Sequence, residues 1–132
     1  GPDQALHAAL GMRAAVEELN AERAAAALPA IRIGIGLHHG DLMLGVIGES
    51  ERIDTTVLAD AVNTASRVEG LTRRLDATIL VSGETLAALP EPDAFRTRFL
   101  ERTLVKGRSV PLDIHELVGL GAAPPEPPAL GA

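Results

Sequence analysis

The stretch IRIGIGLHHGDLMLGVIG, residues 31–48, is the part of the chain that decides the fold. Apolar residues alternate with other types along its first half, as they do in a half-buried strand. Four aliphatic residues therefore share one face of a predicted strand: Ile31, Ile33, Ile35 and Leu37. A short turn with the sequence HHGD follows, and a second apolar run covers residues 42–47. Two such runs around a short turn predict a β-hairpin.

The second face of this hairpin is nearly bare, because glycine occupies three of its positions. These are Gly34, Gly36 and Gly45. Glycine inside a strand is unfavourable unless another group approaches the backbone closely. Two interpretations stay open: a bulge or a tightly packed helix, or a ligand that lies against the bare face.

The remaining elements are predicted from the spacing of apolar residues and from residues typical of helix ends and turns. Residues 3–24 carry an apolar stripe at helical spacing, with Asp3 as the expected N-cap. We expect a second helix from about residue 58 to Gly70, a strand over residues 77–83, and a short helix that begins near Ser82 or Gly83. Two more strands, joined at KGRS (residues 106–109), complete the pattern.

This order of elements predicts an α+β fold, with a mixed, mostly antiparallel sheet and helices packed on one of its faces. Residues 1–118 would form one domain. Residues 119–132 hold four of the nine prolines and are predicted to be a tail or linker.

Composition narrows the possible partners. The net charge of −6 argues against nucleic acid as a partner, because phosphate binding favours a basic surface. No apolar run approaches the ~20 residues that span a bilayer, so we expect no direct membrane contact. The absence of cysteine fits a cytoplasmic location, alone or as the cytosolic domain of a larger protein.

Three polar features could bind a ligand. Asn63 and Arg67 lie one turn apart on the polar side of the second predicted helix, where a solvated surface is the simpler interpretation. Lys106, the one lysine of the chain, lies beside a glycine in a turn that could hold phosphate or could be ordinary surface.

The sequence HHGD could suggest a metal site, formed by His38, His39 and Asp41. Adjacent residues of a strand point to opposite faces, so the two histidines should not reach one ion. A third ligand is not evident nearby. We therefore predict no metal site in this chain.

Several of these motifs occur together and in order: G-I-x-x-H-x-G, N-T-A-S-R (residues 63–67) and V-K-G-R-S (residues 105–109). In this respect the chain, from residue 3 to about residue 118, resembles the class III adenylate/guanylate cyclase catalytic domain. The resemblance implies a ferredoxin-like cyclase fold that is truncated at its N-terminus. It also implies conversion of ATP, or alternatively GTP, to the cyclic nucleotide and pyrophosphate, in a site between two domains, most simply a homodimer.

The resemblance assigns a role to each matching residue. Asn63 would orient the ribose, and Arg67 would stabilise the charge that builds on the α-phosphate. Lys106 would bind the terminal phosphates. Thr56 matches the position that reads the purine, with the backbone of Val57 beside it.

The Mg²⁺ or Mn²⁺ ions of the family's reaction have their ligands outside this chain, because the two aspartates that hold them precede the helix at residues 3–24. This leaves two alternatives to an enzyme. One is a non-catalytic cyclase-homology module for dimerisation or regulation, and the other is a ferredoxin-like binding domain with no nucleotide role.

Overall fold

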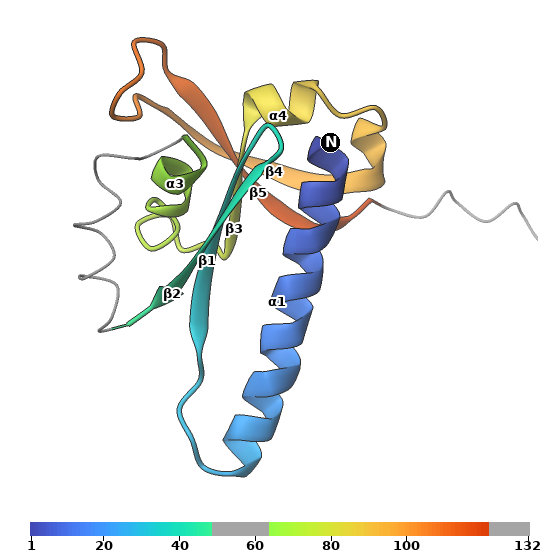
Figure 1. Cartoon of the computed structure of the whole chain (residues 1–132), viewed down its shortest axis with the longest axis vertical. Helices are drawn as coiled ribbons and strands as arrows, with labels where there is room; N and C mark the ends of the chain where they lie inside the picture. Colours follow the sequence, from blue (N-terminus) through green and yellow to red (C-terminus); the bar gives the residue numbers. More distant parts are fainter. Residues whose placement is uncertain (49–63, 122–132) are drawn as a thin grey trace, which may run out of the picture.

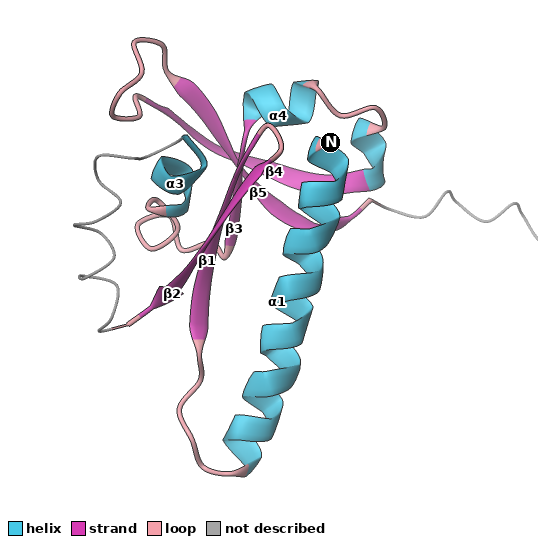
Figure 2. Ribbon diagram, viewed as in Figure 1, coloured by secondary structure: helices cyan, strands magenta, loops and turns pink. Residues whose placement is uncertain are grey.

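A computed structural model describes residues 1–48 and 64–121. Its centre is a five-stranded sheet with the strand order β2-β1-β3-β5-β4 (Figures 1 and 2). The strands are β1 (Arg32–His38), β2 (Asp41–Ile47), β3 (Ile79–Ser82), β4 (Phe95–Thr103) and β5 (Leu112–Leu120). The helices are α1 (Pro2–Ala25), α3 (Thr64–Glu69), α4 (Gly83–Ala87) and a 3₁₀ turn, η1 (Pro92–Ala94).

The predicted hairpin is confirmed. β1 and β2 pair in antiparallel register, with Ile35 opposite Leu44 and His38 opposite Asp41. β1 also pairs with β3 in parallel, whereas β5 pairs in antiparallel fashion with both β3 and β4. The sheet is therefore mixed and mostly antiparallel, as the sequence predicts.

The predicted opening helix is confirmed as α1, which is one long helix (Figure 1). Asp3 does not cap it: the helix begins at Pro2, and Asp3 lies in the first turn. Proline is favourable there because the first backbone N–H groups of a helix have no partner within it. Near the other end, the Asn20 amide donates to the Ile31 carbonyl at 2.8 Å and accepts from the Ile31 N–H at 2.7 Å, which ties α1 to the start of β1.

The aliphatic face of β1 packs under α1. Ile35 and Leu37 are fully buried, and Leu6 and Ala9 of α1 are buried in the same cluster. Ile33 of β1, residues of the other strands and the segment after α4 complete this core cluster: Ile33, Ile79, Val81, Leu89, Phe95 and Leu117. Excluding this apolar surface from water is the main source of stability on this side of the sheet.

The glycine face of β1 packs against α3. A Cβ atom added at Gly36 would lie 2.3 Å from the Ala65 carbonyl oxygen and 2.3 Å from the Glu69 backbone nitrogen. One at Gly34 would lie 2.3 Å from the Thr72 hydroxyl. The bare face therefore exists because a helix backbone lies directly on it, and of the two open interpretations the packed helix is the observed one.

The predicted fold class is confirmed, but one detail differs. We expected helices on one face of the sheet, whereas α1 and α3 lie on opposite faces (Figure 1). Around α3 a second core cluster forms: Val68, Ala77, Leu80, Val105, Leu112 and Ile114. The short apolar stretch of α3 and the glycines opposite it did not by themselves show which face this helix would take.

Among residues 1–48 and 64–121, no helix combines the length and the apolar character needed to cross a bilayer.

Candidate functional site

The structure describes two of the five predicted site residues, Arg67 and Lys106. The other three, Thr56, Val57 and Asn63, lie outside the described residues, and their roles stay predictions. The predicted start of the second helix, near residue 58, lies outside them as well.

Arg67 lies in the last turn of α3. Its neighbours Ala65 and Val68 are fully buried against the sheet and fix the rotation of the helix, so Arg67 stands on another side and is partly exposed. Within the described part of the chain, its guanidinium has no side-chain hydrogen bond or ion pair. A planar cation without a protein partner on a fixed helix can accept an anionic ligand in a bidentate contact.

Lys106 lies in the loop between β4 and β5 and is exposed. Gly107, which follows it, has φ +91°, a conformation that glycine adopts without strain. On the other side, Val105 is buried in the second core cluster and holds the loop against the protein. The ammonium makes no ion pair with any described residue, so it is open to a ligand.

The fold brings these two cations to the same side of the sheet. Val68, next to Arg67, and Val105, next to Lys106, belong to one buried cluster. The loop between β4 and β5 and the helix α3 also lie on the same side in Figure 1. Elements that are far apart in the sequence thus carry these two cations on the same side of the sheet.

An ion pair anchors the loop between β4 and β5. Arg108 donates to Glu84 of α4 at 2.6 Å, and its side chain is mostly buried. The contact holds the loop two residues from Lys106, so Arg108 positions the lysine. Sequence reasoning missed this role, since the signal is only an arginine in the turn and a glutamate in the first turn of a predicted helix.

Next to Glu84, a hydrogen-bonded network surrounds the end of β1. His38 is buried, and its Nδ1 lies 2.7 Å from the Ser82 hydroxyl, which lies 2.7 Å from the Thr85 hydroxyl. The Thr85 hydroxyl accepts from the His39 N–H at 2.7 Å. Burial lowers the pKa of His38, and the neighbouring charges of His39 and Arg108 lower it further, while Glu84 and Asp41 oppose the change.

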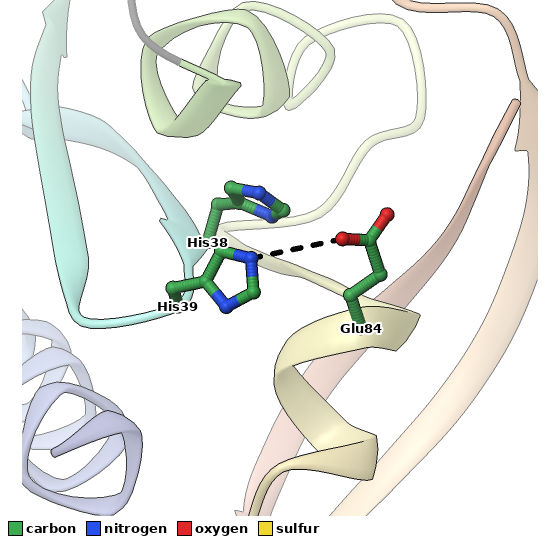
Figure 3. A group of neighbouring side chains, drawn as sticks. All are labelled: His38, His39 and Glu84. Carbon is green, nitrogen blue, oxygen red and sulfur yellow. Dashed lines mark ion pairs between the residues drawn. The ribbon is translucent and has the colours of Figure 1, made fainter. Parts of the chain in front are cut away.

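The two histidines come together, contrary to our expectation. His39 lies past the end of β1 and has φ +54°, so the alternation of a strand does not apply to it. The rings of His38 and His39 have centroids 4.1 Å apart. The carboxylate beside them comes from Glu84 (Figure 3), and not from Asp41. The geometric reason for predicting no metal site therefore does not hold.

A cavity of about 190 Å³ lies elsewhere, between α1 and the start of β1. Arg13, Asn20, Ile31 and Thr72 are among its lining residues, and neither Arg67 nor Lys106 is. The candidate site therefore lies outside this cavity.

Comparison with known proteins shows which sequences the chain resembles. The chain is 40% identical over 120 residues to an adenylate cyclase of Anabaena cylindrica, covering 87% of this chain and 24% of that protein. It is 36% identical over 118 residues to adenylate cyclase 1 of Rhizobium meliloti (strain 1021), covering 89% of this chain and 17% of that protein. It is 34% identical to a terminal-differentiation-specific adenylate cyclase of Dictyostelium discoideum, over 67% of this chain and 4% of that protein.

The chain thus spans a quarter or less of the length of these relatives. No solved structure gives a significant match. The sequence profile described as "Adenylate and Guanylate cyclase catalytic domain" matches residues 3–118, nearly the whole chain. The resemblance is confirmed, and the chain belongs to the adenylate and guanylate cyclase catalytic domain family.

Proposed function

We propose that this chain is part of a class III nucleotidyl cyclase that converts ATP to cyclic AMP and pyrophosphate. The observation that carries the proposal is the placement of Arg67 and Lys106 on one side of the sheet, each without a protein partner among the described residues. Membership of the family supplies the reaction type. Relatives that are named adenylate cyclases support ATP as the substrate, with GTP as the alternative.

Arg67 and Lys106 would each contact a different part of the nucleotide. In the reaction, the ribose 3′-hydroxyl forms a bond to the α-phosphorus while the bond to the pyrophosphate oxygen breaks. Arg67 would stabilise the negative charge that develops on the α-phosphate, and Asn63, one turn before it, would orient the ribose. Lys106 would bind the terminal phosphates in both the ground state and the transition state. Thr56 and the backbone of Val57 would contact the purine.

The family generally uses divalent metal ions. Mg²⁺ and Mn²⁺ favour oxygen ligands. Among the described residues, the one group that meets the spacing of a metal site holds two imidazoles and one carboxylate, which does not fit a pair of such ions. We therefore derive no catalytic step through a metal held by these residues. The ligands for Mg²⁺ or Mn²⁺ would lie outside this chain.

A second cyclase domain would complete the site, most simply in a homodimer. Apolar side chains next to Lys106 support this: Leu104 is 64% exposed and Val110 is 61% exposed. Large apolar residues that stay in water beside a proposed binding loop favour a partner surface. Cyclase activity per chain should then fall on dilution below the dissociation constant of the dimer.

The decisive experiment measures cyclic AMP production by the complete protein with MgCl₂ or MnCl₂. Arg67→Ala should lower kcat by roughly 10²–10³-fold, the effect of losing one group that stabilises transition-state charge. Lys106→Ala should mainly raise KM, by roughly 10- to 100-fold, because a charge-assisted contact present in both states is lost. Comparing kcat/KM for ATP and GTP identifies the purine.

The matched control is Arg98→Ala, which removes an exposed arginine that pairs with Glu116 on β4 and β5. It should leave kcat and KM unchanged. A loss of less than about threefold in Arg67→Ala would reject the transition-state role. A complete protein that binds nucleotide but forms neither cyclic AMP nor cyclic GMP would favour a non-catalytic module.

A further inference from the structure

Three side chains from separate elements meet at one end of β1. The ligand atoms of His38, His39 and Glu84 all lie within 4.8 Å of one another. Figure 3 shows them around one space, with the two histidines at the end of β1 and Glu84 on the first turn of α4. His38 is buried, while the side chains of His39 and Glu84 are 59% and 43% exposed. The group is thus anchored on the protein side and open on the solvent side.

The backbone holds the two histidines in this arrangement. A non-glycine residue with positive φ is uncommon, although histidine is among the types that tolerate it. His39 adopts φ +54° in the turn, and its N–H donates to the buried hydroxyl of Thr85. The hairpin turn and α4 are thereby fixed relative to each other. The imidazoles reach the carboxylate without any rearrangement of the backbone.

One of the three ligand–ligand distances is close to that of a tetrahedral metal site, and all three lie within 4.8 Å. Two ligands that each lie about 2.0–2.1 Å from zinc are separated by roughly 3.3 Å. His39 Nε2 lies 3.6 Å from Glu84 Oε1. Rotation of the exposed side chains of His39 and Glu84 would bring their atoms to bonding distance around the buried His38.

Hydrogen bonds around the group match those of a metal's outer shell. The Ser82 hydroxyl is positioned to accept from Nδ1–H of His38, which leaves Nε2 as the ligand atom. Glu84 Oε2 accepts from Arg108, so Oε1 is the oxygen that faces His39. Each proposed ligand thus keeps one atom for the metal while a second atom or a backbone group is fixed by the protein.

We infer that His38, His39 and Glu84 form a binding site for a divalent transition-metal ion of the zinc type, with water in the fourth position. Two imidazoles and one carboxylate suit Zn²⁺, Co²⁺ or Ni²⁺, whereas Mg²⁺ favours oxygen ligands. The site would be distinct from the Mg²⁺ or Mn²⁺ requirement of the proposed reaction. Because Glu84 also binds Arg108, the ion would brace α4 and the loop that carries Lys106.

The alternative is an ordinary ion pair between His39 and Glu84 beside a buried histidine. Titration calorimetry with ZnCl₂ on the untagged protein separates the two. We expect one ion per chain, and His39→Ala and Glu84→Gln should each weaken binding by roughly 100-fold, since each removes one of few ligands. Bound Co²⁺ should give the visible absorption of a tetrahedral ion. Millimolar MgCl₂ should not displace either metal.

Matched controls come from the same chain. His7→Ala and Glu91→Gln remove an exposed histidine and an exposed glutamate away from the group, and they should leave affinity unchanged. Arg108→Gln removes the outer-shell partner of Glu84 but no ligand, so it should weaken binding less than Glu84→Gln does. His38 is buried, so its variant is His38→Gln, which retains a polar group near Ser82. Its zinc affinity is compared with that of the unchanged protein after circular dichroism has shown that the variant folds.

Three results would overturn the inference. One is zinc binding whose affinity is unchanged in both His39→Ala and Glu84→Gln. Another is a loss in Arg108→Gln as large as that in Glu84→Gln, because the carboxylate would then act through the ion pair. The third is displacement of bound Zn²⁺ or Co²⁺ by millimolar MgCl₂. None of these measurements uses cyclase activity, so the site and the proposed function are tested separately.

Discussion

The two faces of β1 are packed in opposite ways. On one face, Ile35 and its aliphatic neighbours fill the space under α1 with side-chain volume. On the other, Gly36 leaves no side chain at all, and the backbone of α3 occupies that place. One strand therefore joins a face stabilised by buried apolar surface to a face defined by close backbone contact.

The two faces of β1 therefore have different roles: one mainly stabilises the fold, and the other mainly positions α3. The α1 face buries large residues and supplies much of the hydrophobic free energy of folding. The α3 face fixes how closely α3, and with it Arg67, approaches the sheet. A small change in volume should be tolerated better on the first face than on the second, because side chains can repack and a helix backbone cannot.

The largest effect should come from adding one carbon to the glycine face. Gly36→Ala places a methyl group against the backbone of Ala65 and Glu69, so α3 must move away from the sheet. We expect a loss of about 3 kcal/mol in the free energy of unfolding, the upper end of the overpacking range. Urea denaturation measures it. Gly11→Ala, where a Cβ meets no atom within 4 Å, is the control and should be neutral or slightly stabilising.

Removing one carbon from the aliphatic face should cost less. Ile35→Val deletes a buried methyl group and should lower the free energy of unfolding by about 1 kcal/mol. The same urea experiment gives the value. If Ile35→Val were as damaging as Gly36→Ala, the proposed difference between the faces would be wrong.

A third substitution tests whether backbone contact is the cause. Gly45→Ala on β2 would bring its methyl group close to the carboxylate of Glu69 and not to a backbone atom. A flexible side-chain end can move, so the expected loss is about 1 kcal/mol or less. A loss that matches that of Gly36→Ala would show that any added volume on this face is harmful, whichever atom it meets.

The smallest effect concerns pH and the face that α1 covers. His115 of β5 pairs with Val81 and so shares this face, and burial lowers its pKa below the ordinary value of 6.5, with Asp113 opposing. A lowered folded pKa means that the unfolded chain binds more protons. The stability that His115 contributes is therefore complete above about pH 6.5 and is lost as pH falls through the folded pKa. His115→Gln should show a shallower loss of stability between about pH 7 and 5 than the unchanged protein, measured by urea denaturation at each pH. Equal slopes for the two proteins would refute this assignment.

Much of the fold could be predicted from local pattern. Alternation over residues 31–38 identified β1, and the apolar stripe over residues 3–24 identified α1. Ser82 as a cap also identified the start of α4, where its hydroxyl accepts from the Thr85 N–H. These features depend on neighbours within a few residues, so the sequence carries them directly.

The candidate site could be predicted only in part. Arg67 and Lys106 came from the family's motifs, and their roles stay predictions until the substitutions are measured. The Arg108–Glu84 contact was missed, because it joins a loop to a helix 24 positions away in the sequence. The rotation of His39 toward His38 was missed because it depends on a positive φ in one turn.

The sequence by itself determined the hairpin, the long opening helix and the identity of the family, since periodicity and motif spacing are properties of the chain. Only the tertiary structure decided that α3 lies on the glycine face and that a loop lysine and a helix arginine lie on the same side. It also decided that two histidines and a glutamate converge at the end of β1. These placements result from packing between distant segments, where the shape of one surface selects its neighbour, and local pattern does not record that choice.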